Sequence, residues 1–201
     1  MKLTRSTWLA FAIMIIVGAV SRLLSLSVAG VAPQMALALF GGAVIKDKKW
    51  AFALPLFSLL LSDTIMQLMN IPERPGFYEG QWATYLCFAI VTVYGFLMKR
   101  VNFGKVLFFS ISGSVIFFLF SNFFVWAGHG GLKRPMTFDG LMLCYWDALA
   151  YYRDYGLIKG FIANQALGDV IWSVAIFGLY YIINKFSFEP KREMALEGNK
   201  K

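Results

Sequence analysis

The sequence predicts an all-α membrane protein with six transmembrane helices, both termini in the cytoplasm, and an amphipathic helix on the outer surface. Three observations lead to this fold class. Hydrophobic residues make up 59% of the 201 residues and charged residues only 15%, whereas soluble domains carry about a quarter charged residues. Apolar stretches of about 18 residues or more recur along the chain. Lys and Arg alternate between rich and poor connecting segments.

Six apolar stretches are the candidate spans. The first has the charged start and apolar core of a signal peptide, but its length favours a span. The second is short and rich in small residues, so we expect it to be tilted, buried among the others or extended by its flanks. The six spans are Trp8–Leu26, Ala32–Ile45, Trp50–Met69, Trp82–Met98, Val106–Trp126 and Asn164–Asn184.

Positive charge sets the predicted orientation. Of the 19 Lys and Arg residues, thirteen lie in the N-terminus, in segments 46–49 and 99–105, and after Asn184, and six lie at the opposite side. Because cytoplasmic loops are enriched in Lys and Arg, both termini are predicted to be cytoplasmic. Residues 1–186 should form one membrane domain, and residues 187–201 a disordered polar tail. No basic recognition segment occurs, so the net charge of +8 does not indicate nucleic-acid binding.

The last outer loop, 127–163, is long enough to contain a helix of its own. The stretch "TFDGLMLCYWDALAYYRDYG" has an amphipathic pattern, and we expect it to lie on the outer surface rather than to span the membrane. Its apolar positions are Leu141, Leu143, Cys144, Ala148 and Leu149. Its polar positions are Asp139, Asp147, Arg153 and Asp154.

Polar side chains in the spans gather at one depth. At about 1.5 Å per helical residue, Arg22, Asp63 and Asn122 lie roughly 20 to 24 Å above the cytoplasmic start of their spans, and Asp169 lies near that level. Ionisable groups in a bilayer cost about 2.5 to 3.5 kcal/mol each, so they should face the bundle interior and pair. We therefore predict a polar pocket in the outer third of the membrane. Its candidate substrate-binding residues are Arg22, Gln34, Asp63, Gln67, Trp82, Asn122, Trp126, Asp147 and Asp169.

Asp63 is the most unusual of these residues, because it interrupts the apolar run "LFSLLLSDTIMQLM". We expect it to line the pocket and to pair with Arg22, for which Asp169 competes. Asp63→Asn should then leave folding largely intact and weaken ligand capture. The alternative is that Arg22 and an aspartate form only a helix-locking pair.

The sequence contains no motif for catalysis. The nucleophile elbow, the HExxH zinc motif and the phosphate loop are all missing, so we expect neither enzymatic activity nor a cofactor. Two cysteines are too few for a disulfide framework or a zinc site of the usual spacing. Cys87 is expected to act as a small buried hydrophobe, with a soft metal or cobalt ligand as the alternative.

Several stretches resemble a widespread family of uncharacterised bacterial inner-membrane proteins, over about residues 15 to 183. In size, span number and outward-facing pocket, that family is similar to the S components of energy-coupling factor (ECF) vitamin transporters, which bind the substrate. The stretches that carry the resemblance are "APQMALALFGGAVI", "FSLLLSDTIM", "GFYEGQWATYL", "SNFFVWAG", "TFDGLMLCYWDALAYYR" and "LGDVIWSVAIFG".

The resemblance implies a multi-pass protein of the bacterial inner membrane that captures a vitamin or another small nutrient. It also implies a transmembrane coupling subunit with ATPases, which S components contact through small residues, here Ala32, Ala36, Ala38 and Gly42. Two alternatives stay open. The protein could be a solitary cobalamin or corrinoid transporter that uses Cys87, or a structural or assembly protein of the membrane without a transport role.

Overall fold

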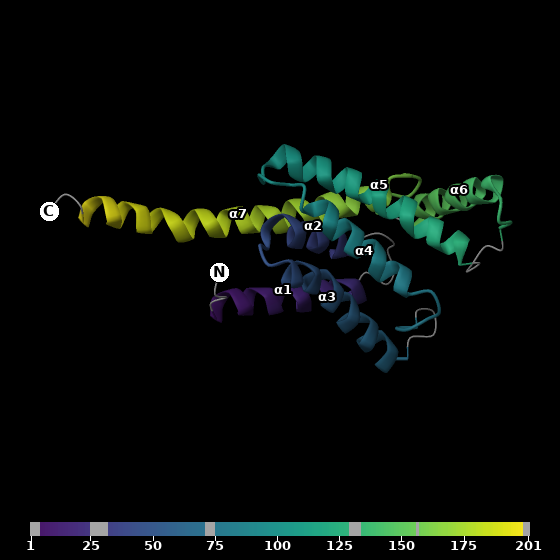
Figure 1. Cartoon of the computed structure of the whole chain (residues 1–201), viewed down its shortest axis with the longest axis horizontal. Helices are drawn as coiled ribbons and strands as arrows, with labels where there is room; N and C mark the ends of the chain where they lie inside the picture. Colours follow the sequence, from purple (N-terminus) through teal and green to yellow (C-terminus); the bar gives the residue numbers. More distant parts are fainter. Residues whose placement is uncertain (1–4, 25–31, 71–74, 129–133, 156, 199–201) are drawn as a thin grey trace.

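A computed structural model describes the chain at residues 5–24, 32–70, 75–128, 134–155 and 157–198. These residues form seven α-helices and no strand. The start of α1 and the end of α7 lie at the same end of the bundle, and α6 lies at the opposite end (Figure 1). The helices are α1 (Arg5–Leu24), α2 (Gln34–Val44), α3 (Lys48–Leu68), α4 (Trp82–Gly95), α5 (Phe103–Ala127), α6 (Phe138–Tyr155) and α7 (Asn164–Gly198).

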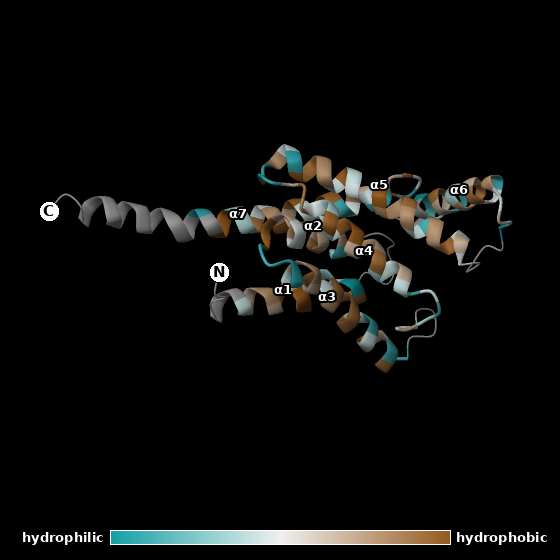
Figure 2. Ribbon diagram, viewed as in Figure 1, coloured by the Kyte–Doolittle hydropathy of each residue, from teal (hydrophilic) through white to brown (hydrophobic). Residues whose placement is uncertain are grey.

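Three of these helices are long and apolar enough to cross a membrane: α3, α5 and residues Asn164–Ile183 of α7. The apolar part of α1, and all of α2 and α4, are shorter. Each of the six apolar stretches in the sequence nevertheless corresponds to a helix. Hydrophobic residues dominate these helices, and hydrophilic residues gather mainly near their ends and in the connections (Figure 2).

Helix α2 occupies the centre of the bundle. It packs against every other described helix except α6, and each residue from Gln34 through Gly42 is buried. Its 11 residues extend only about 16 Å, roughly half the thickness of a hydrocarbon core. Burial among the other helices, one of the three arrangements expected for this short stretch, is therefore the one observed.

Small residues allow the neighbours of α2 to approach closely. A Cβ atom added to Gly42 would lie 2.3 Å from the carbonyl oxygen of Thr92 and 2.8 Å from the Cα atom of Gly95. Ala36 and Ala38 are fully buried in the same helix. The small residues of α2 thus form contacts inside this bundle. Ala36, Ala38 and Gly42 are not on the surface of the folded chain, where a partner subunit would bind.

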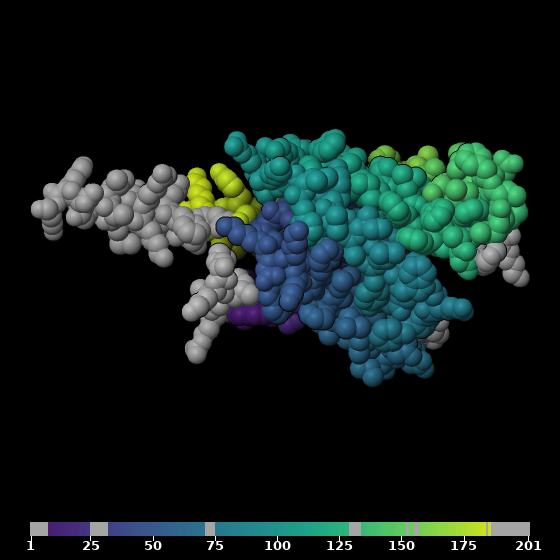
Figure 3. Space-filling view, in the orientation of Figure 1, coloured from purple at the N-terminus to yellow at the C-terminus, as the bar shows by residue number. Residues whose placement is uncertain are grey.

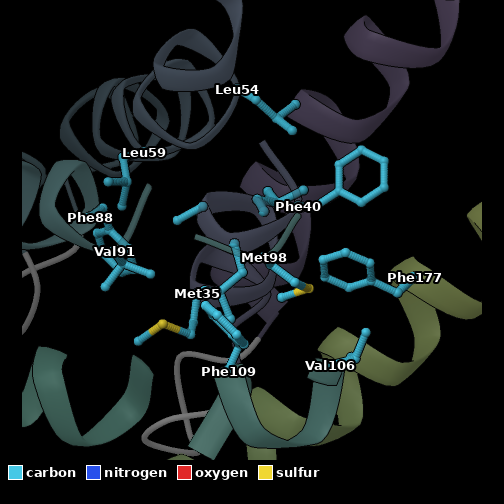
Figure 4. Close-up of a cluster of buried hydrophobic side chains, with 13 residues drawn as sticks. Met35, Phe40, Leu54, Leu59, Phe88, Val91, Met98, Val106, Phe109 and Phe177 are labelled. Carbon is cyan, nitrogen blue, oxygen red and sulfur yellow. The ribbon is translucent and has the colours of Figure 1, made fainter. Parts of the chain in front are cut away.

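The apolar core surrounds α2 and draws side chains from α3, α4, α5 and α7 (Figure 4). Phe40 of α2 packs edge to face against Phe177 of α7, with ring centroids 5.4 Å apart. Outside the core, α1 exposes a continuous apolar stripe formed by Leu9, Ile13 and Ile16, which is the surface that a lipid environment favours.

Helices α6 and α7 extend the bundle at its two ends. Helix α6 packs against the end of α5 (Figure 3), with Cys144 on its buried side and Leu143 and Trp146 exposed. Helix α7 continues through Gly198, past residue 187, where the sequence predicts a disordered tail. The Lys, Arg, Glu, Met, Ala and Leu residues of that segment all have high helix propensity.

Candidate functional site

Arg22 and Asp63 form an ion pair between α1 and α3. The Nη1 group of Arg22 donates to Oδ1 of Asp63 and lies 2.7 Å from the hydroxyl oxygen of Ser62. Arg22 lies in the last turn of α1, where the helix dipole also favours a positive charge. The predicted pairing of Arg22 with Asp63 is thus present, and Asp169 takes no part in it.

Two residues at the start of α4 are the other hydrogen-bond donors to Asp63. Gln81 donates through Nε2 to Oδ2 of Asp63, and the hydroxyl of Tyr85 donates to the same oxygen over 2.6 Å. The amide of Gln81 also donates to the carbonyl of Gly76 over 2.8 Å. The carboxylate therefore accepts from three side chains and joins α1, α3 and α4. Its side chain is 2% exposed.

The second buried carboxylate, Asp169, belongs to a different contact. Ser110 and Ser114 lie one turn apart on α5 and face Ser173 and Asp169, which lie one turn apart on α7. The two serine oxygens of Ser110 and Ser173 are 3.1 Å apart, and Ser114 donates to Oδ2 of Asp169 over 2.6 Å. Among the residues that the structure describes, no cation forms an ion pair with Asp169.

A cavity of about 150 Å³ lies between these two groups of polar residues, and helices α1, α2, α3, α4, α5 and α7 all contribute to it. Its polar lining consists of Arg22, Gln34, Thr84, Gln165 and Asp169. Its apolar lining consists of Ala32, Met35, Leu59, Phe88 and Phe117. Asp63 is not part of this lining and reaches the cavity only through Arg22.

Gln34 brings the central helix into the cavity wall. Its side-chain Nε2 donates to the carbonyl oxygen of Gly18 over 3.1 Å. This bond fixes the amide orientation, because the reversed amide would place two oxygens against each other. Its Oε1 is buried and has no hydrogen-bond partner among the described residues. Buried acceptors are rarely left in this state.

The remaining candidates from the sequence lie elsewhere. Gln67 is exposed and accepts from the backbone N–H of Phe77, and Trp82 is 63% exposed. Asn122 donates to a carbonyl of its own helix, and its side chain does not reach the ionised groups. The indole of Trp126 donates to the carbonyl of Pro135.

Asp147, on α6, is held by Arg134. Both Nε and Nη2 of that arginine donate to Oδ2, over 2.9 and 2.6 Å. This pair lies in the last outer loop of the predicted topology and is absent from the cavity lining. Of the nine candidate residues, the cavity therefore brings together Arg22, Gln34 and Asp169, with Asp63 behind Arg22.

Cys87 is buried and does not line the cavity. The part of the chain that the structure describes contains no group of three or more His, Cys, Asp or Glu residues placed to hold a metal ion. The position of Cys87 is that of a small hydrophobe in the helix packing.

Sequence reasoning did not select the other seven lining residues as binding residues. They are Ala32, Met35, Leu59, Thr84, Phe88, Phe117 and Gln165. A signal for Gln165 was present, because Gln165, Asp169 and Ser173 are four residues apart and must share one face of a helix. Thr84 and Phe88 have the same spacing on α4. Depth alone could not find these positions, because depth does not specify which way a helix faces.

Comparison with known proteins gives one match. A family model described as "Family of unknown function (DUF6580)" matches residues 2–192. No curated protein and no solved structure matches the chain.

Proposed function

Because the chain belongs to this family of unknown function, DUF6580, we propose its function from its own cavity: it is a membrane-embedded binding protein that captures a small nutrient for uptake. In this proposal the protein corresponds to the substrate-binding subunit of a transporter and catalyses no reaction. The bacterial inner membrane is the proposed location, with six helices crossing or partly crossing the bilayer.

The observation that carries the proposal is that Gln34, a lining residue of the cavity, has a buried acceptor without a partner among the described residues. Asp169, another lining residue, accepts within the described residues a hydrogen bond from Ser114 alone. A purely structural polar cluster is expected to satisfy its own members, as the surroundings of Asp63 do. Unused acceptors beside a cavity are what a binding site requires.

The position of the cavity fits capture from outside the cell. Arg22 lies near the end of α1, and Gln34 and Asp169 lie near the starts of α2 and α7. Under the positive-inside rule these three helix ends face outward. The pocket then opens in the outer third of the membrane, and the inner part of the bundle is closed by the apolar core.

The volume of the cavity restricts the nutrient. A volume of about 150 Å³ is smaller than that of typical pockets for drug-sized ligands, roughly 300 to 1,000 Å³. A corrinoid is far too large for this cavity, and Cys87 is not on its wall. We therefore propose a small nutrient rather than cobalamin. A coupling subunit, if one energises uptake, must dock on a surface other than Ala36, Ala38 and Gly42, which are buried.

The proposal is tested by closing the cavity. Thr84→Phe adds a ring at the cavity lining, and Thr64→Phe places the same ring on α3, where Thr64 is not a lining residue. Wild type and both variants are purified in lipid nanodiscs, and bound small molecules are identified by native mass spectrometry. We expect a molecule on the wild type and on Thr64→Phe, and none on Thr84→Phe.

Two outcomes would contradict the proposal. The first is that no small molecule co-purifies with the wild type and that no member of a metabolite panel raises its unfolding temperature. The second is that Thr84→Phe retains the molecule as well as Thr64→Phe does. Either outcome favours a structural or assembly role in the membrane.

A further inference from the structure

Asp169, a lining residue of the cavity, has an oxygen that the described part of the fold does not use. The residue is 4% exposed, and within the described residues its one hydrogen bond runs from Ser114 to Oδ2. The hydroxyl of Ser114 has a single proton, which it shares with the carbonyl of Ser110 at 2.9 Å. Oδ1 forms no hydrogen bond within the described residues, so this carboxyl group has more acceptor capacity than the fold uses.

Gln34, which belongs to the same cavity lining, has a second unused acceptor. The residue is 2% exposed, its Nε2 is engaged by Gly18, and its Oε1 is unpaired among the described residues. A ligand that binds both atoms must donate hydrogen bonds at two positions. A ligand that has only acceptors cannot do so.

The charges around the cavity favour a positive ligand. Arg22 carries one positive charge, and Asp63 already pairs with it. Asp169, when ionised, adds a negative charge that no described cation neutralises. A net negative charge in this setting is costly. A bound monovalent cation removes that cost and in turn favours the ionised form of Asp169.

The apolar part of the cavity lining suits an apolar body. The rings of Phe88 and Phe117 pack together with centroids 4.8 Å apart, and Met35 and Leu59 also belong to the lining. Aromatic faces attract cations as well as apolar groups. A volume of about 150 Å³ is similar to that of an engineered protein cavity that holds benzene.

From these four features we infer that the cavity binds a small organic monocation, a primary or secondary ammonium with an apolar body about the size of a benzene ring. Its N–H groups donate to Oδ1 of Asp169 and Oε1 of Gln34, and its body packs against Phe88 and Phe117. This inference rests on the proposed function and names the chemical class of its ligand.

The experiment compares three probes that share one ring and differ in charge: benzylamine, benzyl alcohol and benzoate. Dissociation constants are measured by calorimetry at neutral pH on full-length protein in nanodiscs. We expect benzylamine to bind at least about tenfold more tightly than benzyl alcohol, because a hydrogen bond to a charged group is stronger than a neutral one. Benzoate should not bind.

Variants then assign the effect to Asp169. Asp169→Asn keeps the shape of the side chain and removes its charge. It should raise the dissociation constant of benzylamine roughly tenfold or more and leave that of benzyl alcohol nearly unchanged. Asp139→Asn removes an exposed carboxylate of α6 and should bind as wild type does. Gln165→Glu adds a carboxylate to the same lining and should strengthen benzylamine binding, which keeps the test decisive if Asp169→Asn does not fold.

The ligand class is wrong if benzylamine does not bind, if benzyl alcohol or benzoate binds as tightly, or if Asp169→Asn and Gln165→Glu both leave benzylamine affinity unchanged. The mass of the co-purifying molecule separates this failure from failure of the proposed function. A neutral or anionic molecule overturns the inference and leaves the binding function standing. If nothing co-purifies and no probe binds, both are wrong.

Discussion

Asp63→Asn is the most direct test of how the bundle is held together. The carboxylate accepts from Arg22, Gln81 and Tyr85, and asparagine has the same shape but a single oxygen. If its oxygen faces Arg22, its NH₂ group meets the NH₂ group of Gln81. The Gln81 amide cannot reverse to accept, because it also donates to Gly76. In the other orientation, the asparagine NH₂ group meets Arg22.

The expected magnitude follows from burial. Removing one member of a buried ion pair costs about 3 to 5 kcal/mol. The side chain of Asp63 is 2% exposed, but that of Arg22 is 24% exposed, so solvent can partly compensate the arginine that is left behind. We therefore expect a loss near the lower limit, about 3 kcal/mol. For a chain of this length, that loss corresponds to roughly 6 to 12 °C in the unfolding temperature.

The assay is thermal unfolding in one detergent, followed by intrinsic tryptophan fluorescence and by the loss of the monomer peak in gel filtration. Asp139→Asn on α6 is the matched control, because Asp139 is exposed and such a change usually shifts stability by no more than about 0.5 kcal/mol. Equal unfolding temperatures for Asp63→Asn and Asp139→Asn would refute the reasoning. Asp63 would then not stabilise the contact of α1, α3 and α4.

Two further predictions concern packing and thiol reactivity. Gly42→Ala directs a methyl group at the backbone of Thr92 and should lower the free energy of unfolding by about 1 to 3 kcal/mol. In Gly178→Ala the methyl group enters open space, and the change should stabilise α7 by up to about 1 kcal/mol. Thermal unfolding of the two variants measures both effects. Burial raises the pKa of the Cys144 thiol, so iodoacetamide should modify it slowly in the folded protein at pH 7 to 8 and rapidly after unfolding, as intact-protein mass spectrometry can measure.

Both predictions have a clear opposite result. Equal stability of Gly42→Ala and Gly178→Ala would mean that α2 and α4 are not in close contact. Modification of Cys144 in the folded protein at the rate of the unfolded chain would mean that α6 does not pack on α5 as described.

The helices and the main ion pair were predictable because both depend on position along the chain. The length of an apolar run locates a membrane-protein helix to within a few residues. The second run is too short for an ordinary span, and the sequence already indicates this. Residue depth then placed Arg22 and Asp63 at one level, where a buried charge must find a partner. The structure changes one expectation. The sequence predicts that Asp63→Asn leaves folding largely intact, whereas a carboxylate that joins three helices leads us to expect a loss of stability.

The composition of the cavity was less predictable, because it depends on rotation about each helix axis. The sequence predicts that Asn122 and Trp126 lie near the depth of the pocket, yet their side chains bond their own helix and the following loop. Trp82 is mostly exposed. The rotation of each helix is set by its packing against several others. A single sequence indicates this rotation only where polar residues repeat along one helix face, as Gln165, Asp169 and Ser173 do.

The central position of α2 has a consequence for biogenesis. Helix α2 leaves the ribosome early, but its final neighbours include α7, which is synthesised after the other six described helices. Until α7 is present, one side of a short helix lacks its native packing partner, and the cavity wall is incomplete. A chain truncated before α7 should therefore fail to assemble the bundle around α2 and be cleaved by proteases faster than the chain that includes α7.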